Sequence, residues 1–106
     1  MIFIVVRFTV RPEHADGWLD LVADFTAATR AEPGNVFFDW SRSVDDPNVY
    51  VLTEAFRDDA AEAHVTSEHF RKAMSELPKA IATTPQIINV TIPQDGWSEM
   101  AELKPA

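Results

Sequence analysis

The sequence predicts an α+β domain with the ferredoxin-like order β-α-β-β-α-β and one antiparallel sheet. The first observation is an N-terminal run, MIFIVVRFTV, rich in the branched and aromatic residues that favour strands. The second is a pair of similar runs joined by a few turn residues, which is typical of an antiparallel hairpin. The third is helical spacing of apolar residues on both sides of that hairpin. Together these features indicate the split βαβ arrangement, and 106 residues fit one such domain.

The first strand is predicted at 2–10 and the first helix at 12–31. Alternate residues of the strand share one face, namely Ile2, Ile4, Val6, Phe8 and Val10. The helix begins at Pro12, which suits a first turn, and it stops at Glu32-Pro33-Gly34. Apolar residues recur along it at helical spacing, namely Trp18, Leu21, Val22, Phe25 and Ala28. We therefore expect one helix, with Trp18 and Phe25 packed on the sheet, where they could also line the cavity wall.

The hairpin strands are predicted at 36–44 and 49–57, with a turn at Asp45-Asp46-Pro47-Asn48. One face of the earlier strand carries Val36, Phe38, Trp40 and Arg42, and the other carries Phe37, Asp39 and Ser41. Alternation alone does not decide which of these faces meets the helices. On the later strand one face carries Tyr50, Leu52, Glu54 and Phe56.

The second helical region is predicted in two pieces. Asp58 or Asp59 can cap the first piece, and Glu62 completes a capping-box pattern from Asp59. Ser67 can cap the second piece, near 68–77, which would bury Phe70, Ala73, Met74 and Leu77. A fourth strand at 86–92 closes a domain of residues 1–93. Residues 94–106 are predicted to form a polar tail that carries Trp97.

The charge and composition exclude several classes of function. The net charge of −8 argues against a nucleic-acid partner, because binding to phosphates needs clustered Lys and Arg, and it argues against an anionic membrane surface for the same reason. The chain has no cysteine, which excludes disulfides and thiolate sites. The N-terminal run lacks the basic start and the cleavage site of a leader. We therefore expect a cytoplasmic protein.

One face of the predicted sheet has no helix to cover it. That face would expose Phe, Val and Ile side chains from several strands, and an apolar patch of this size usually marks an interface. We therefore predict a homodimer that packs sheet against sheet.

The order of motifs in the hairpin and second helical region resembles the antibiotic biosynthesis monooxygenase family. The matching pieces are EPGNVFFDWSRSVDDPNVYVLTEAFRD, at 32–58, and AHVTSEHFRKAM, at 63–74. They contain Glu32-Pro33-Gly34, Asp46-Pro47, Glu54 and the pattern H-x-x-S-x-H-F from His64 to Phe70. The resemblance implies a dimeric α+β barrel with a ligand pocket between the helices and the sheet. It also implies oxidation of an electron-rich aromatic substrate, such as a quinol, an anthrone or a polyketide-like compound, by O₂ without flavin or metal.

The candidate catalytic residues are His64, Glu54 and His69. An imidazole titrates near neutral pH, so His64 suits a base or a hydrogen-bond donor. Glu54 lies among apolar neighbours and needs a partner, for which His64 is suitable. His69 falls in the first turn of the helix after Ser67, where the helix dipole favours its neutral form. Each has a structural alternative: a histidine that only holds the hairpin to the helix, a structural ion pair, and a packing residue.

The candidate substrate-binding residues are aromatic side chains that could stack on a flat substrate and one arginine that could stabilise a phenolate. They are Trp40, Phe38, Arg42, Phe56, Phe70 and Trp18. The aromatic ones could equally belong to the core or to a dimer interface. No metal site is predicted, because His64 and His69 are five residues apart and would diverge by about 140° on one continuous helix. A kink at Ser67 would remove this objection.

Three other functions fit the same fold. Isomerase or cyclase chemistry needs the same base but no O₂, and a non-catalytic binding dimer needs only the pocket. Haem degradation is the least favoured, because the position aligned with its haem-ligating histidine lies near Met74, and Arg7 stands nearest the asparagine of its first strand. The sequence does not name the substrate.

Overall fold

The computed structural model describes all 106 residues and confirms the predicted α+β fold. The strands are β1 (Ile2–Thr9), β2 (Asn35–Arg42), β3 (Val49–Phe56) and β4 (Gln86–Thr91). The helices are α1 (Pro12–Ala15), α2 (Trp18–Leu21), α3 (Ala23–Arg30), α4 (Ala61–Val65), α5 (Glu68–Glu76) and the 3-10 helix η1 (Leu77–Lys79). None of these helices combines the length and the apolar character that crossing a membrane would require.

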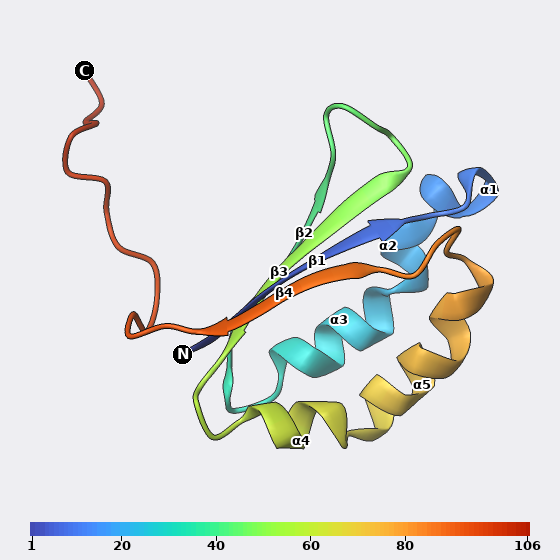
Figure 1. Ribbon diagram of the computed structural model, residues 1–106, viewed down its shortest axis with the longest axis horizontal. Helices are drawn as coiled ribbons and strands as arrows, with labels where there is room; N and C mark the ends of the chain where they lie inside the picture. The colour runs from blue at the N-terminus through green and yellow to red at the C-terminus, as the bar shows by residue number, and fades with distance from the viewer.

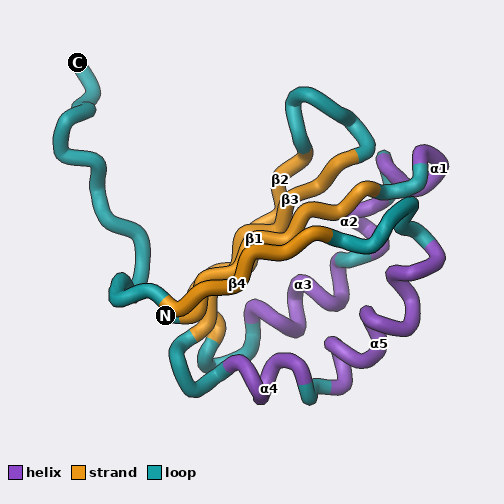
Figure 2. The backbone as a smooth tube through the Cα atoms, in the orientation of Figure 1, coloured by secondary structure: helices purple, strands orange, loops and turns teal.

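The four strands form one antiparallel sheet in the order β2-β3-β1-β4. Figure 1 shows the helices gathered on one side of this sheet, with α3 and α5 side by side, and Figure 2 shows the two layers in the same view. The last residues lead away from the sheet (Figure 1). The fold therefore has one covered and one open sheet face.

The core lies between the helices and the covered face. It contains Val6 and Phe8 of β1 and Leu52 of β3, together with the fully buried Trp18. The question left open for β2 is settled, because Phe38 is buried and Trp40 packs against the core. Phe37, from the opposite face, contacts Phe3 and the tail residue Trp97 instead.

The prediction of a continuous helix at 12–31 is wrong. Gly17 separates α1 from α2, and glycine is a poor helix former because it loses the most backbone freedom. Val22 separates α2 from α3, with φ −96° and ψ 6°, outside helical geometry. Trp18 and Phe25 still pack toward the sheet, as expected, but Leu21 is 40% exposed.

Of the two helix caps predicted after β3, one is present. Ser67 precedes α5, and its hydroxyl accepts a hydrogen bond from the Phe70 N–H at 3.2 Å. The capping box from Asp59 is absent, because α4 begins after Ala60 and has no side-chain cap. Ala73 and Leu77 of the second piece are buried, whereas Met74 is 48% exposed because it lies on the outer side of α5.

The open sheet face is apolar along its centre. Cross-strand pairs on this face bring Phe3 beside Val90 and Val5 beside Ile88. Val90 remains 43% exposed and Ile88 63% exposed in the single chain. Such a patch is typical of an interface, and the homodimer through this face stays a prediction.

Gly34 fixes the loop after α3 against the turn before α4. A Cβ added at Gly34 would lie 2.2 Å from the Cβ of Ala60, which is too close for two carbon atoms that are not bonded to each other. The Arg57 N–H also donates to the Gly34 carbonyl at 2.9 Å, so the two segments are in direct contact. We expect Gly34→Ala to lower the free energy of unfolding by about 1–3 kcal/mol, as overpacking does. Urea denaturation measures this loss.

The double variant Gly34→Ala/Ala60→Gly should recover most of that stability, because it removes the clashing methyl group. Glycine is tolerated better than alanine before the first turn of a helix, so the second change costs little. Gly96→Ala is the matched control, since no heavy atom lies within 4 Å of its added Cβ. A single variant as stable as the wild type would contradict this account.

Candidate functional site

His64 lies in α4 with its imidazole inside an aromatic enclosure. The residue is only 5% exposed. The centroid of its ring lies 4.6 Å from that of Phe56 and 5.1 Å from that of Phe70. Phe25 and Phe38 complete the enclosure at 6.0 and 6.5 Å. Apolar walls of this kind strengthen any electrostatic interaction made within them.

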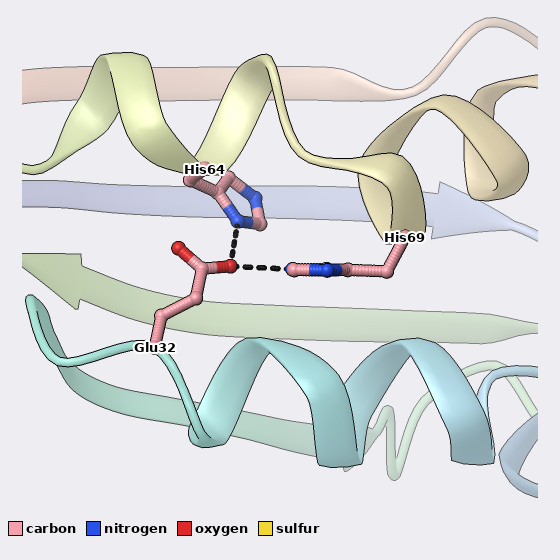
Figure 3. A group of neighbouring side chains, drawn as sticks. All are labelled: Glu32, His64 and His69. Atoms are coloured by element: carbon pink, nitrogen blue, oxygen red, sulfur yellow. Dashed lines mark hydrogen bonds and ion pairs between the residues drawn. The ribbon is translucent and has the colours of Figure 1, made fainter.

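Glu32, in the loop between α3 and β2, joins the two histidines. Its Oε2 atom lies 2.8 Å from Nδ1 of His64 and 2.6 Å from Nε2 of His69, as Figure 3 shows. When Glu32 is ionised its oxygen can only accept hydrogen bonds, and these two contacts then require a hydrogen on each of the two ring nitrogens. In a neutral His64 the lone pair is therefore on Nε2.

The break between α4 and α5 brings the histidines together. The Ser67 hydroxyl donates to the His64 carbonyl at 2.6 Å while it accepts from the Phe70 N–H, so it holds the chain at the break. On one continuous helix the two side chains would point about 140° apart. The break at Ser67 turns both side chains toward the same oxygen, which removes the geometric objection to a shared site.

Glu54 approaches His64 from β3. Its Oε1 lies 3.9 Å from Nε2 of His64, which is beyond hydrogen-bond distance, and the residue is 5% exposed. Burial, and then the negative charge of Glu32, raise the pKa of Glu54 to about 7. A separation of this size could be bridged by a single oxygen atom at about 2.8 Å from each group. The predicted pair therefore faces each other on the covered side of the sheet, without touching.

A groove of about 340 Å³ leads toward this cluster from the surface. It runs between α3 and α5, and His69 and Phe25 lie along it, whereas no strand residue does. The resemblance implied a pocket between the helices and the sheet, so the observed hollow lies further out, with His69 between it and the buried His64. Its lining residues are Leu21, Val22, Asp24, Phe25, Ala28, Glu68, His69, Lys72, Ala73, Glu76 and Leu77.

The candidate substrate-binding residues divide into two groups. Phe38, Phe56 and Phe70 surround His64. Trp18 and Trp40 pack against each other in the core, with ring centroids 5.7 Å apart, and neither makes an aromatic contact with a histidine.

Arg42 lies apart from the site. It forms an exposed ion pair with Asp16 at 2.8 Å, donates to the Pro47 carbonyl and lies over the Tyr50 ring. These contacts hold the β2–β3 hairpin to the start of the helical layer, and they do not bring the guanidinium near the histidines.

Glu32 is the site residue that the sequence did not single out. Glu32 was interpreted only as part of the stop Glu32-Pro33-Gly34. The feature of the sequence that could have indicated Glu32 is its place directly before a Pro-Gly turn, where proline restricts the backbone and so limits where the carboxylate can lie. Phe25 was expected to pack on the sheet or to line the cavity wall; it packs against the core, lines the groove, and lies beside both imidazoles, with ring centroids 6.0 and 6.2 Å away.

Comparison with known proteins places this arrangement in a family. Residues 1–76, which include the cluster and most of the fold, match the family named "Antibiotic biosynthesis monooxygenase". The chain belongs to the antibiotic biosynthesis monooxygenase family. It is also 31% identical over 72 residues to the "Putative monooxygenase YcnE" of Bacillus subtilis, a match that covers 67% of this chain and 76% of that protein. The family supports a monooxygenase-like role for the chain.

Solved structures of similar proteins support the fold. The structure of Rv0793 from Mycobacterium tuberculosis superposes with a TM-score of 0.78 at 24% identity, covering 92% of this chain and 98% of that one. A structure from Deinococcus radiodurans superposes with a TM-score of 0.81 at 20% identity, covering 95% and 100%. At these identities the likeness extends to the architecture and not to the substrate.

Proposed function

We propose that this protein is a cofactor-independent monooxygenase that oxidises an electron-rich aromatic substrate, such as a quinol or an anthrone, with O₂. The observation that carries this proposal is the buried His64, whose Nδ1–H is held by Glu32 and whose Nε2 faces Glu54. A carboxylate on one ring nitrogen fixes the tautomer and makes the other nitrogen a stronger base. The family membership supports the same class of reaction.

The chemistry requires a base and a water-poor aromatic pocket. Nε2 of His64 removes a proton from the substrate, and the resulting anion donates an electron to O₂. Recombination of the two radicals forms a substrate hydroperoxide, which loses water to leave a carbonyl. For an anthrone the balance is one CH₂ group and one O₂ giving one C=O group and one H₂O. The substrate supplies all the electrons, so the protein contributes proton transfer and positioning.

Glu54 suits a second proton-transfer role in this scheme. A substrate oxygen between Nε2 of His64 and Oε1 of Glu54 would contact both groups. Since the pKa of Glu54 is raised to about 7, the carboxyl can donate and accept a proton near neutral pH. It would accordingly return a proton to the peroxide oxygen that leaves as water.

Oxygen uptake with a panel of hydroquinones and anthrones tests the proposal. We expect the wild-type protein, treated with EDTA, to consume one O₂ per substrate converted, well above the autoxidation rate. No conversion is expected under nitrogen. Conversion that continues without O₂ would overturn the proposal in favour of an isomerase or cyclase. Saturable binding without conversion, in air, would favour a binding protein instead.

A further inference from the structure

Glu32, His64 and His69 form a ligand set that fits a divalent transition-metal ion. One ligand atom from each residue lies within 4.8 Å of the other two. Two imidazole nitrogens and a carboxylate oxygen are a donor set that zinc uses in proteins, with a further position left for water or substrate. We propose that these three residues bind Zn²⁺, reversibly and at one ion per chain.

Shifts of roughly 1 Å in the positions of the ligand atoms would admit the ion. Ligand atoms about 2.1 Å from a tetrahedral zinc lie roughly 3.4 Å from one another. The two contacts to Oε2 of Glu32 are 2.8 and 2.6 Å, so each must open by less than about 1 Å. The side chains already point toward one another from three separate segments (Figure 3). The ion would take the place of the two hydrogen bonds that now join them.

The surroundings compensate the charge that a metal ion brings. Glu32 supplies one negative charge as a ligand, and Glu54 supplies a second group beside the same histidine, 3.9 Å from its Nε2. A metal-bound histidine commonly donates its remaining N–H to a carboxylate, which orients the ring. Glu54 is placed to accept that hydrogen after a small movement.

The route for the ion is the groove between α3 and α5. His69 lines this groove, and its side chain remains 24% exposed, whereas the side chains of His64 and Glu32 are 6% and 13% exposed. The ion would therefore meet His69 first. The open coordination position would face the same side, where a water molecule can occupy it.

Zinc and the proposed oxidation would compete for His64. When the ion occupies Nδ1, the ring proton must lie on Nε2, and that nitrogen can no longer act as a base. Zinc should then inhibit the oxidation. The expected inhibition rests on the proposed function, whereas the binding of zinc does not.

Calorimetric titration of the EDTA-treated, buffer-exchanged protein with Zn²⁺ alone tests the site. We expect one ion per chain, and affinity weakened more than 100-fold by His69→Gln or Glu32→Gln, beyond the 10- to 100-fold loss typical of outer-shell partners. Glu54→Gln should fall within that smaller range. His14→Gln is the matched control, because His14 lies in α1 outside the cluster, and its affinity should be unchanged.

A second readout is the position of the ring proton of His64. Nitrogen NMR of the imidazole should show the proton on Nδ1 without zinc and on Nε2 with it. Equal zinc affinity in the wild type and in a folded His69→Gln variant would overturn the proposal, as would loss of affinity in His14→Gln. Zinc binding without any oxidase activity would support the metal site and contradict only the proposed function. Oxidase activity without specific zinc binding would support the proposed function and contradict the metal site.

Discussion

Replacing His64 with glutamine is expected to lower the rate of aromatic oxidation by about 10²- to 10⁴-fold, the usual contribution of a positioned general base. Glutamine is polar and can still hydrogen-bond Glu32, so the buried carboxylate keeps a partner. It has no basic nitrogen to face Glu54, and the substrate proton has no acceptor at that position. The measurement is kcat/KM from O₂ uptake, with EDTA present and autoxidation subtracted.

Two further variants show whether the loss belongs to the base. His14→Gln should retain the wild-type rate, because His14 makes no contact with the cluster. His69→Gln should lose less than His64→Gln, because Glu32 would still hold Nδ1 of His64. If a folded His64→Gln variant kept the wild-type rate while Glu54→Gln lost it, the base would be Glu54.

The sequence was sufficient to predict the strands and to group their side chains into two faces. Alternation is a local property, and the residues that it grouped, Val6 with Phe8 on β1 and Tyr50 with Leu52 on β3, are buried together. It did not decide which face meets the helices, because Phe37 and Phe38 on β2 are both aromatic and only the packed helices distinguish them. The continuous first helix failed for a related reason, since apolar spacing persists through Gly17 and Val22 although the backbone does not.

The sequence indicated three of the four polar residues of the candidate site. His64, His69 and Glu54 carried a chemical signal and do lie together, because the H-x-x-S-x-H pattern contains its own helix break at Ser67. Glu32 was missed because it is more than thirty positions away from both histidines and comes close only in the folded chain, where Gly34 lies against Ala60. Arg42 shows the opposite error: it shares a strand face with Phe38, but the strand carries it toward Asp16.

Replacing Glu54 with glutamine is expected to stabilise the protein at alkaline pH and to leave it nearly unchanged at acid pH. Burial and the Glu32 charge raise the pKa of Glu54 from 4.5 to about 7 in the folded chain. Between these two values the folded state binds more protons than the unfolded state, so the free energy of unfolding falls as pH rises. The stability from the protonated carboxyl is fully present below pH 4.5 and is lost as pH rises through 7.

Glutamine resembles the protonated carboxyl but cannot ionise, so Glu54→Gln escapes this loss. The difference in unfolding free energy between variant and wild type should grow from near zero at pH 4 to about 3 kcal/mol at pH 8, following the pKa difference. Urea denaturation across this range, with EDTA present, measures it. Glu62→Gln is the matched control, because Glu62 is exposed on α4 and should give no such trend.

A constant difference across the whole pH range would show that the pKa of Glu54 is the same in the folded and unfolded chain, and a difference that moves against the variant as pH rises would show a carboxylate paired with a charged His64. A difference that grows with pH would instead mean that the fold keeps a destabilised carboxylate beside an imidazole at neutral pH. Since hydrophobic side chains could occupy that position at no such cost, its retention would argue that the group serves proton transfer rather than packing.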